Sequence, residues 1–364
     1  FKIKSVESLP ITTPEQRKEY LEREHWNVFG LRSQEVTVDL LTDSGTGSMS
    51  SEQWAAIMRG DEAYAGSHSW QRFHEVVSDL TGYKHIIPTH QGRASEKILA
   101  TITVKEGDII PSNSHFDTTR ANFEFAQAKP VDLLCEEGLD LLSQAPLKGN
   151  IDLSNLEALL SGEESDKVPF VLMTITNNTG GGQPVSMDNL KKVKELCTQY
   201  NKMFLLDACR FAENAWFVSQ REEDYKDIEI RDITKEAFRL ADGCTISLKK
   251  DGFGNIGGVL ALNDDTLAEA ARNLLILTEG FPTYGGLTGR DLDALAQGLK
   301  EITDRNYLEY RARSISYLGE KALSYGIPVV QPAGGHALYI DAKTFLPHIP
   351  PHEYPGHSIA CEIY

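Results

Sequence analysis

The stretch VPFVLMTITNNTGGGQPVSMDNLKKVKELCTQYNKMFLLDACR, residues 168–210, predicts a β-strand, an α-helix and a second β-strand in succession. Its first part, 168–178, is apolar and rich in β-branched residues, which is typical of a buried strand. Ser186 suits the N-cap of a helix in which Leu190 and Val193 share one face. The segment KMFLLDACRF predicts the returning strand. This unit indicates a mostly parallel sheet with right-handed crossovers.

Composition limits the classes of protein to which the chain can belong. Its 364 residues, 41% of them hydrophobic, suffice for a large domain and a smaller one. The net charge of −17 disfavours a nucleic-acid partner, which requires a basic face. No apolar run reaches the ~20 residues of a membrane-spanning helix. The five cysteines are scattered without a C-x-x-C pair, which fits reduced thiols in the cytoplasm.

Polar residues at predicted strand ends are candidates for a site, because ligands of parallel sheets bind at the carboxyl ends of strands. Each of them alone has a simpler interpretation, since a strand-end aspartate commonly caps a turn and a lysine pair is commonly solvated. A glycine and an arginine at a helix start, with free backbone N–H groups, suit a phosphate. Three strand ends and one helix start carry such residues: Asn177 and Asn178; Asp207 and Arg210; Ser247, Lys249, Lys250 and Asp251; and Gln91, Gly92 and Arg93.

Together these residues meet the requirements of one cofactor, pyridoxal phosphate. It needs an amine for its aldehyde, a carboxylate for its ring nitrogen, a cation for its ring oxygen and a cup for its phosphate. Asp207 and Arg210 supply the carboxylate and the cation, and the QGR segment with a strand-end serine supplies the cup. A turn follows the strand, so the spacing leaves open whether Lys249 or Lys250 is the amine.

From FKIKSVES at its start to its last residue, the chain carries the motifs DLLTDSGTG, RGDEAYAGS, PTHQGR, GGQPVS, DACRFAEN, SLKKD, EGFPTYGGL and GGHALYIDA in this order. With them it resembles the family of β-eliminating lyases that cleave aromatic amino acids. The resemblance implies a fold-type I pyridoxal-phosphate enzyme: a large α/β domain, with a mostly parallel sheet flanked by helices, and a smaller α+β domain. We expect residues 1–44 to form an arm and part of the small domain, 45–303 the large cofactor-binding domain, and 304–364 the beginning of the small domain, which we expect to continue past Tyr364. The segment EVTVDLLTDSGTGSMS (35–50) predicts a short strand and a turn.

The resemblance also implies roles at the cofactor site. Lys250 would carry the cofactor, Asp207 would pair with the ring nitrogen, and Arg210 would face the ring oxygen. The other cofactor contacts that it implies are a phosphate cup, a stacking ring and two flanking side chains: Gln91, Gly92, Arg93 and Ser247; Phe116; and Asn178 and Lys249.

Further residues are assigned by the resemblance to the substrate, to a cation and to a second subunit. The contacts implied for the substrate carboxylate are Thr42, Ser44 and Asn178. Tyr64 would donate a proton across a subunit boundary, which implies a homo-oligomer, expected to be a homotetramer. Potassium would bind an oxygen-only set, as suits a hard cation: Glu62, Gly45 and Asn255.

Asp117 bears on which aromatic amino acid is cleaved. Protonation of indole at C3 places positive charge on the ring nitrogen, which a carboxylate would stabilise. The tryptophan-cleaving branch of the family carries Asp at this position and the tyrosine-cleaving branch carries Thr, so we expect L-tryptophan to give indole, pyruvate and ammonia. Arg120 and Asn255 instead resemble the tyrosine-cleaving branch, which stays the alternative. Asp117 could also simply cap the turn that it forms with Thr118 and Thr119.

Three other interpretations compete with this one. An aminotransferase would keep Asp207 and Lys250 but would not need Asp117, and a non-catalytic relative would be expected to lose Lys250. The residues His348, His352 and His357 have the spacing of metal ligands. Prolines between them prevent one helix from aligning them, so we expect a surface loop there.

Overall fold

The structure, a computed structural model, describes residues 6–364. This part of the chain contains one seven-stranded sheet with the order β1-β7-β6-β5-β4-β2-β3. β7 runs antiparallel to β1 and β6, and the other neighbouring pairs are parallel, so the mostly parallel sheet is confirmed. The strands are β1 (His85–Thr89), β2 (Ile109–Ser112), β3 (Lys129–Asp132), β4 (Phe170–Thr174), β5 (Met203–Asp207), β6 (Gly243–Ser247) and β7 (Gly258–Leu262).

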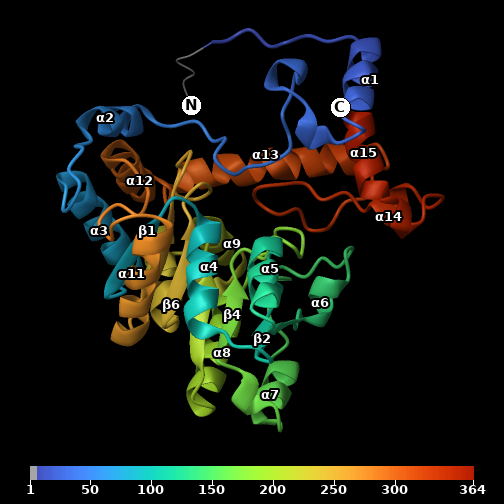
Figure 1. Cartoon of the computed structure of the whole chain (residues 1–364). Helices are drawn as coiled ribbons and strands as arrows, with labels where there is room; N and C mark the ends of the chain where they lie inside the picture. The colour runs from blue at the N-terminus through green and yellow to red at the C-terminus, as the bar shows by residue number, and fades with distance from the viewer. Residues whose placement is uncertain (1–5) are drawn as a thin grey trace.

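Helices cover both faces of the sheet (Figure 1). The sequence of β4 is continuously apolar because both faces of the strand are buried. Phe170 and Leu172 join the core on one face, and Val171 and Met173 join the core on the other. The first face packs against α4 (Gly92–Thr103), α5 (Asp117–Phe125) and α11 (Asp265–Thr278). The second packs against α3 (His68–Thr81), α7 (Leu153–Ser161), α8 (Met187–Gln199), α9 (Phe211–Arg221), α10 (Ile230–Leu240) and α12 (Gly289–Glu301).

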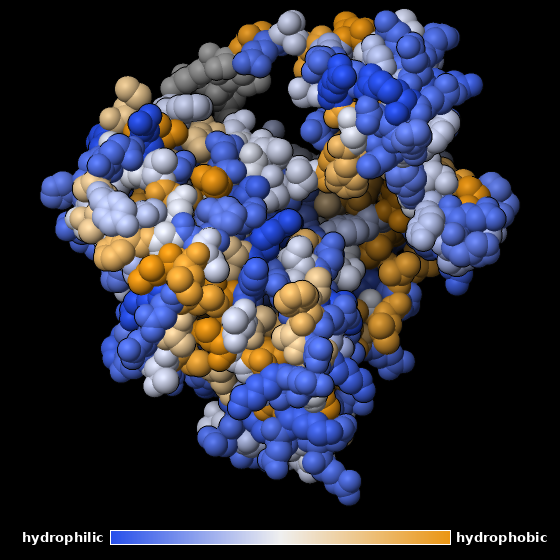
Figure 2. All heavy atoms as spheres, in the orientation of Figure 1, coloured by the Kyte–Doolittle hydropathy of each residue, from blue (hydrophilic) through white to orange (hydrophobic). Residues whose placement is uncertain are grey.

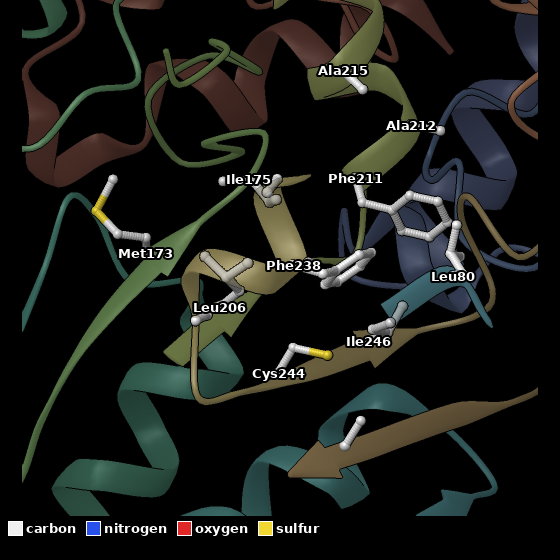
Figure 3. Close-up of a cluster of buried hydrophobic side chains, with 14 of the residues drawn as sticks. Leu80, Met173, Ile175, Leu206, Phe211, Ala212, Ala215, Phe238, Cys244 and Ile246 are labelled. Atoms are coloured by element: carbon white, nitrogen blue, oxygen red, sulfur yellow. The ribbon is translucent and has the colours of Figure 1, made fainter. Parts of the chain in front are cut away.

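The larger core cluster fixes α9 and α10 against the sheet (Figure 3). The rings of Phe211 and Phe238 meet with centroids 5.5 Å apart, above Leu206 of β5 and Ile246 of β6. All four side chains are at most 2% exposed. Because β5 and β6 pack rigidly here, the polar residues that follow them at their carboxyl ends are held in fixed positions.

Several of the remaining elements lie beside the carboxyl ends of the strands. Figure 1 shows α13 lying across this end of the molecule, with α1, α14 and α15 grouped around its right-hand end. The N-terminal segment contacts the last helix, where His357 Nε2 lies 2.6 Å from the Trp26 carbonyl oxygen and Tyr364 Oη donates to the Glu35 carbonyl at 2.9 Å. The elements not yet named are α1 (Pro14–Arg23), α2 (Ser51–Arg59), α6 (Glu136–Leu139), α13 (Arg305–Ser324), α14 (Ala342–Phe345), α15 (Pro355–Ile363), and the 3₁₀ turns η1 (Val28–Gly30), η2 (Ser33–Glu35), η3 (Ser165–Lys167), η4 (Glu223–Tyr225) and η5 (Pro351–Glu353).

The strand predicted within residues 35–50 is wrong. Apart from Glu35, which ends η2, these residues are irregular. Val38 and Leu40 are 65% and 76% exposed, so the alternating pattern has neither a partner strand nor a core to cover. The domain limits at residues 44 and 303 stay a prediction.

The surface viewed in Figure 2 is mixed, with hydrophilic residues over most of it and hydrophobic residues gathered near α4 and α11. Within residues 6–364, no helix combines the length and the apolar character needed to cross a membrane.

Candidate active site

A pocket lies at the carboxyl ends of β4, β5 and β6, beside the start of α4. This carboxyl edge of the sheet is where α/β folds bind their ligands. Eleven residues predicted from the sequence line it: Ser44, Gln91, Gly92, Arg93, Phe116, Asn178, Asp207, Arg210, Ser247, Lys249 and Lys250. Five further residues complete the lining: Glu96, Thr118, Thr174, Thr176 and Cys209.

The start of α4 forms one wall of the pocket. Gln91 is the N-cap residue, but its side chain makes no capping hydrogen bond, so it does not satisfy the first backbone N–H groups of the helix. Gly92 packs so closely on β6 that an added Cβ would lie 2.5 Å from Ser247 Cβ. The exposed N–H groups, the serine and Arg93 form a cradle that fits a phosphate group.

Asp207 ends β5 and is 2% exposed. Its Oδ1 accepts a hydrogen bond from Cys209 Sγ at 2.9 Å, and Cys209 Sγ in turn accepts from the Ser247 backbone N–H at 3.3 Å. Burial raises the pKa of the Cys209 thiol well above its usual range, and the charge of the neighbouring Asp207 raises it further. The thiol therefore keeps its proton and remains a donor. Asp207 thus has one oxygen held by the protein, and a buried carboxylate in this position fits a cationic ring nitrogen.

Lys249 and Lys250 occupy the turn after β6, and both line the pocket. The turn is closed by backbone bonds, among them Phe253 N–H to the Lys250 carbonyl at 3.1 Å. The Lys249 carbonyl accepts from the Gly45 N–H at 2.7 Å, which joins the turn to the N-terminal region. The positions of the two lysines therefore agree with an amine at this site, and the choice of Lys250 stays a prediction.

A buried ionic cluster lies behind the pocket. Arg311 of α13 donates to Asp251 Oδ1 at 2.8 Å and lies 3.0 Å from Glu213 Oε2. His336 bridges Glu213, at 2.8 Å, and the Asn178 side-chain oxygen, at 2.7 Å. Although burial opposes its charge, His336 and Arg311 lower the pKa of Glu213 to about 2. The cluster links α13 to the Lys250–Asp251 turn and to a residue of the pocket wall.

Two residues at or beside the pocket were missed by the sequence reasoning. Glu96 is 6% exposed and accepts from Thr118 Oγ1 at 2.7 Å, and burial together with Asp207 raises its pKa to about 7. Its position one helical turn after Gly92 could have revealed it. Asp43 pairs with Arg210 and lies inside the DLLTDSGTG motif, between two residues that were assigned.

The remaining predicted residues lie outside the pocket lining. Asn255 Nδ2 donates to the Gly45 carbonyl at 2.9 Å, but Glu62 pairs instead with Arg290 at 3.1 Å, so one chain brings two of the three predicted cation ligands together. Tyr64 is 74% exposed and touches Phe281 and Tyr284. Thr42 is exposed and accepts from the Ser44 N–H at 3.0 Å.

Asp117 is the first residue of α5, between two residues that line the pocket. Its side chain is exposed and makes no side-chain hydrogen bond among the described residues. The interpretation of Asp117 as the cap of a turn is therefore not supported by the geometry.

The three histidines near the carboxyl end do not converge. Among residues 6–364, no group of three or more His, Cys, Asp or Glu side chains could hold a metal ion. His352 lies in η5, His357 lies in α15, and the segment between them turns at Tyr354. The surface loop predicted for this segment is wrong in part, because Pro355 begins a helix and His357 lies within it.

A mostly parallel α/β sheet with a lysine turn, a strand-end aspartate and a phosphate cradle at its carboxyl edge defines a fold-type I pyridoxal-phosphate-dependent enzyme. The fold agrees with a solved structure of the threonine aldolase of Leishmania major, with a TM-score of 0.63, 16% identity, and coverage of 82% of this chain and 83% of that chain.

Sequence comparison makes the assignment more specific. The family model described as beta-eliminating lyase matches residues 39–348. Over its full length the chain is 57% identical to the tryptophanase of Hyphomonas neptunium and 47% identical to the tyrosine phenol-lyase of Pasteurella multocida, covering 80% of each. The chain belongs to the β-eliminating lyase family. It is a pyridoxal-phosphate-dependent lyase.

Proposed function

We propose that the protein cleaves L-tryptophan to indole, pyruvate and ammonia. The observation that carries this proposal is the unpaired carboxylate of Asp117 at the start of α5, directly after the pocket residue Phe116. The identity to tryptophanases, 56–57%, against 46–48% for the tyrosine phenol-lyases and a probable β-eliminating lyase, supports the same branch.

We propose one orientation of the cofactor in the pocket. The start of α4, Arg93 and Ser247 would hold its phosphate, Phe116 would stack on its ring, and Asp207 would accept from its ring nitrogen. Lys250 would be the amine that carries it, with Lys249, Asn178 and Arg210 beside it. When bound, pyridoxal phosphate supplies an electron sink for the pair that remains when the substrate Cα loses its proton.

The other steps fall to side chains of the chain itself. Thr42, Ser44 and Asn178 would orient the substrate carboxylate, and Lys250, displaced by the substrate amine, would remove the Cα proton. Tyr64 would deliver a proton to C3 of the indole ring, which then departs as indole rather than as a carbanion. Addition of water gives pyruvate and ammonia, so that tryptophan and water balance the three products.

Asp117 would select the aromatic ring. A proton on C3 of indole leaves positive charge on the ring nitrogen, and a carboxylate next to that nitrogen lowers the energy of this state. A phenol ring protonated in the same way gives a neutral dienone, which gains nothing from a carboxylate. Cleavage of tyrosine is the second candidate, on the strength of Arg120 and Asn255. Arg120, however, is engaged with Asp132 and Glu124.

The substitution Asp117→Thr tests the choice. We expect it to slow tryptophan cleavage by about 10²–10³-fold, the typical loss of one group that stabilises a developing charge. Cleavage of an S-alkyl cysteine, whose leaving group needs no ring proton, should be spared. An equal loss on both substrates would leave Asp117 a purely structural residue.

We also propose a homotetramer that binds potassium and is located in the cytoplasm. Trp54, Met58 and Tyr64 are 59%, 85% and 74% exposed, which suits burial against a second subunit. A partner chain would also bring an acidic residue equivalent to Glu62 to the Gly45–Asn255 pair. Free cysteines throughout support the cytoplasmic location. We propose that residues 1–44 and 304–364 belong to a second, smaller domain beside the large domain of 45–303.

A further inference from the structure

Arg210 connects the cofactor pocket to a segment of irregular backbone. It is the N-cap residue of α9, is 5% exposed and lines the pocket. Its Nε donates to Asp43 Oδ2 at 3.0 Å, and its Nη2 donates to Asp43 Oδ1 at 2.9 Å. Two charge-assisted bonds in this fork fix the orientation of the guanidinium as well as its distance.

Asp43 lies in the segment 39–47, which has no helix or strand. This segment is called the arm from here on, and it is distinct from the longer N-terminal arm predicted for residues 1–44. Its other side-chain and turn bonds are local, such as the Ser44 N–H to Thr42 Oγ1 at 3.0 Å. Among the described residues, the hydrogen bonds that leave the arm form two anchors. One is Gly45, which contacts the Lys249 carbonyl and Asn255, and the other is Asp43 on Arg210.

The pair stays ionised in spite of its burial. Burial opposes the charge of Asp43, but Arg210, His336 and Arg311 lower the pKa of this carboxyl below its ordinary value. Burial likewise opposes the charge of Arg210, but Asp43 and Glu213 raise its pKa. Arg311 Nη2 lies 4.0 Å from Asp43 Oδ2, too far for a hydrogen bond. Asp43 is therefore anchored by Arg210 in particular.

We propose that Asp43 is a positioning residue that orients Arg210 toward the pocket and holds the arm over it. The fork uses Nε and Nη2, so the N–H groups of Nη1 remain for an oxygen atom in the pocket. The same fork places Thr42 and Ser44, which flank Asp43, relative to that arginine. One ion pair thereby fixes both the positions of the substrate contacts Thr42 and Ser44 and the orientation of Arg210 beside the cofactor. The proposal rests on the proposed function for the roles of Thr42, Ser44 and Arg210.

The test compares Asp43→Asn with Asp39→Asn, because Asp39 lies in the same arm but accepts only from the Leu41 N–H. In the cofactor-free protein, amide hydrogen exchange is measured for residues 42–46. We expect exchange to be about 10- to 100-fold faster in Asp43→Asn, as befits the loss of one charge-assisted hydrogen bond. In the loaded enzyme, KM for the amino acid should rise by a similar factor, with a smaller change in kcat. Asp39→Asn should match the wild type in both measurements.

Arg210→Lys provides a second variant, since it retains the charge but cannot form the fork. It should speed up amide hydrogen exchange of residues 42–46 in the cofactor-free protein by a similar factor. Thermal unfolding of each variant identifies one that simply fails to fold. Unchanged arm exchange in folded Asp43→Asn and Arg210→Lys would overturn the proposal. A wild-type protein that neither binds the cofactor nor eliminates would instead refute the proposed function, and the exchange measurement would still decide the role of Asp43.

Discussion

Glu96 should make the stability of the cofactor-free protein fall as the pH rises. This carboxyl is 6% exposed, and burial together with Asp207 raises its pKa from 4.5 to about 7. A carboxyl whose pKa is raised on folding binds its proton more tightly in the folded state. Folding is therefore disfavoured progressively as the pH passes from about 4.5 to 7. Each pKa unit corresponds to about 1.4 kcal/mol, so the whole loss is about 3 kcal/mol.

The substitution Glu96→Gln removes this titration and leaves an amide oxygen for the Thr118 hydroxyl. Urea unfolding at fixed ionic strength between pH 5 and 8 gives the free energy of unfolding of variant and wild type. We expect the difference in stability to shift in favour of the variant by about 2.5 kcal/mol between about pH 5 and 8, because part of the loss already lies below about pH 5. The exposed Glu195 provides a control, since Glu195→Gln should track the wild type. Parallel curves for Glu96→Gln and the wild type would refute the reasoning.

Three further predictions concern the cofactor and the cation. Lys250→Ala should lose the visible absorbance of bound pyridoxal phosphate and Lys249→Ala should keep it, whereas a reducible cofactor linkage in the Lys250 variant would contradict the assignment. Gly92→Ala places a Cβ 2.5 Å from Ser247 Cβ, so cofactor affinity measured by titration should fall at least about tenfold, and unchanged affinity would argue against the phosphate cradle. Turnover should be higher in potassium than in sodium, and Glu62→Gln should abolish the difference. Equal rates of the wild type in both salts would exclude a functional cation site.

Much of the fold follows from periodicity alone. The buried run that became β4, the Ser186 N-cap of α8 and the strand that ends at Asp207 were predicted from local pattern, because strands buried on both faces are continuously apolar. The failure at residues 35–50 has an equally physical reason. An alternating apolar pattern forms a strand only when an edge strand of a sheet is free to pair with it. Whether such an edge is available depends on the whole sheet and not on the local sequence.

The candidate site was predicted only as far as strand ends and one helix start reveal it. Asp207 and the lysine turn end strands, and the sheet brings them together. Asp43 gave no such signal, because its partner Arg210 is 167 residues away and the arm between the anchors has no periodicity. The choice between the two lysines rests on family resemblance, since both line the pocket.

The most direct test of tryptophan cleavage uses the purified protein with pyridoxal phosphate and potassium. L-Tryptophan and L-tyrosine are supplied separately at equal concentrations, and pyruvate is measured together with indole or phenol. We predict faster elimination from tryptophan, with indole and pyruvate formed in equal amounts. Faster release of phenol from tyrosine, or no elimination from either amino acid, would contradict the proposed function.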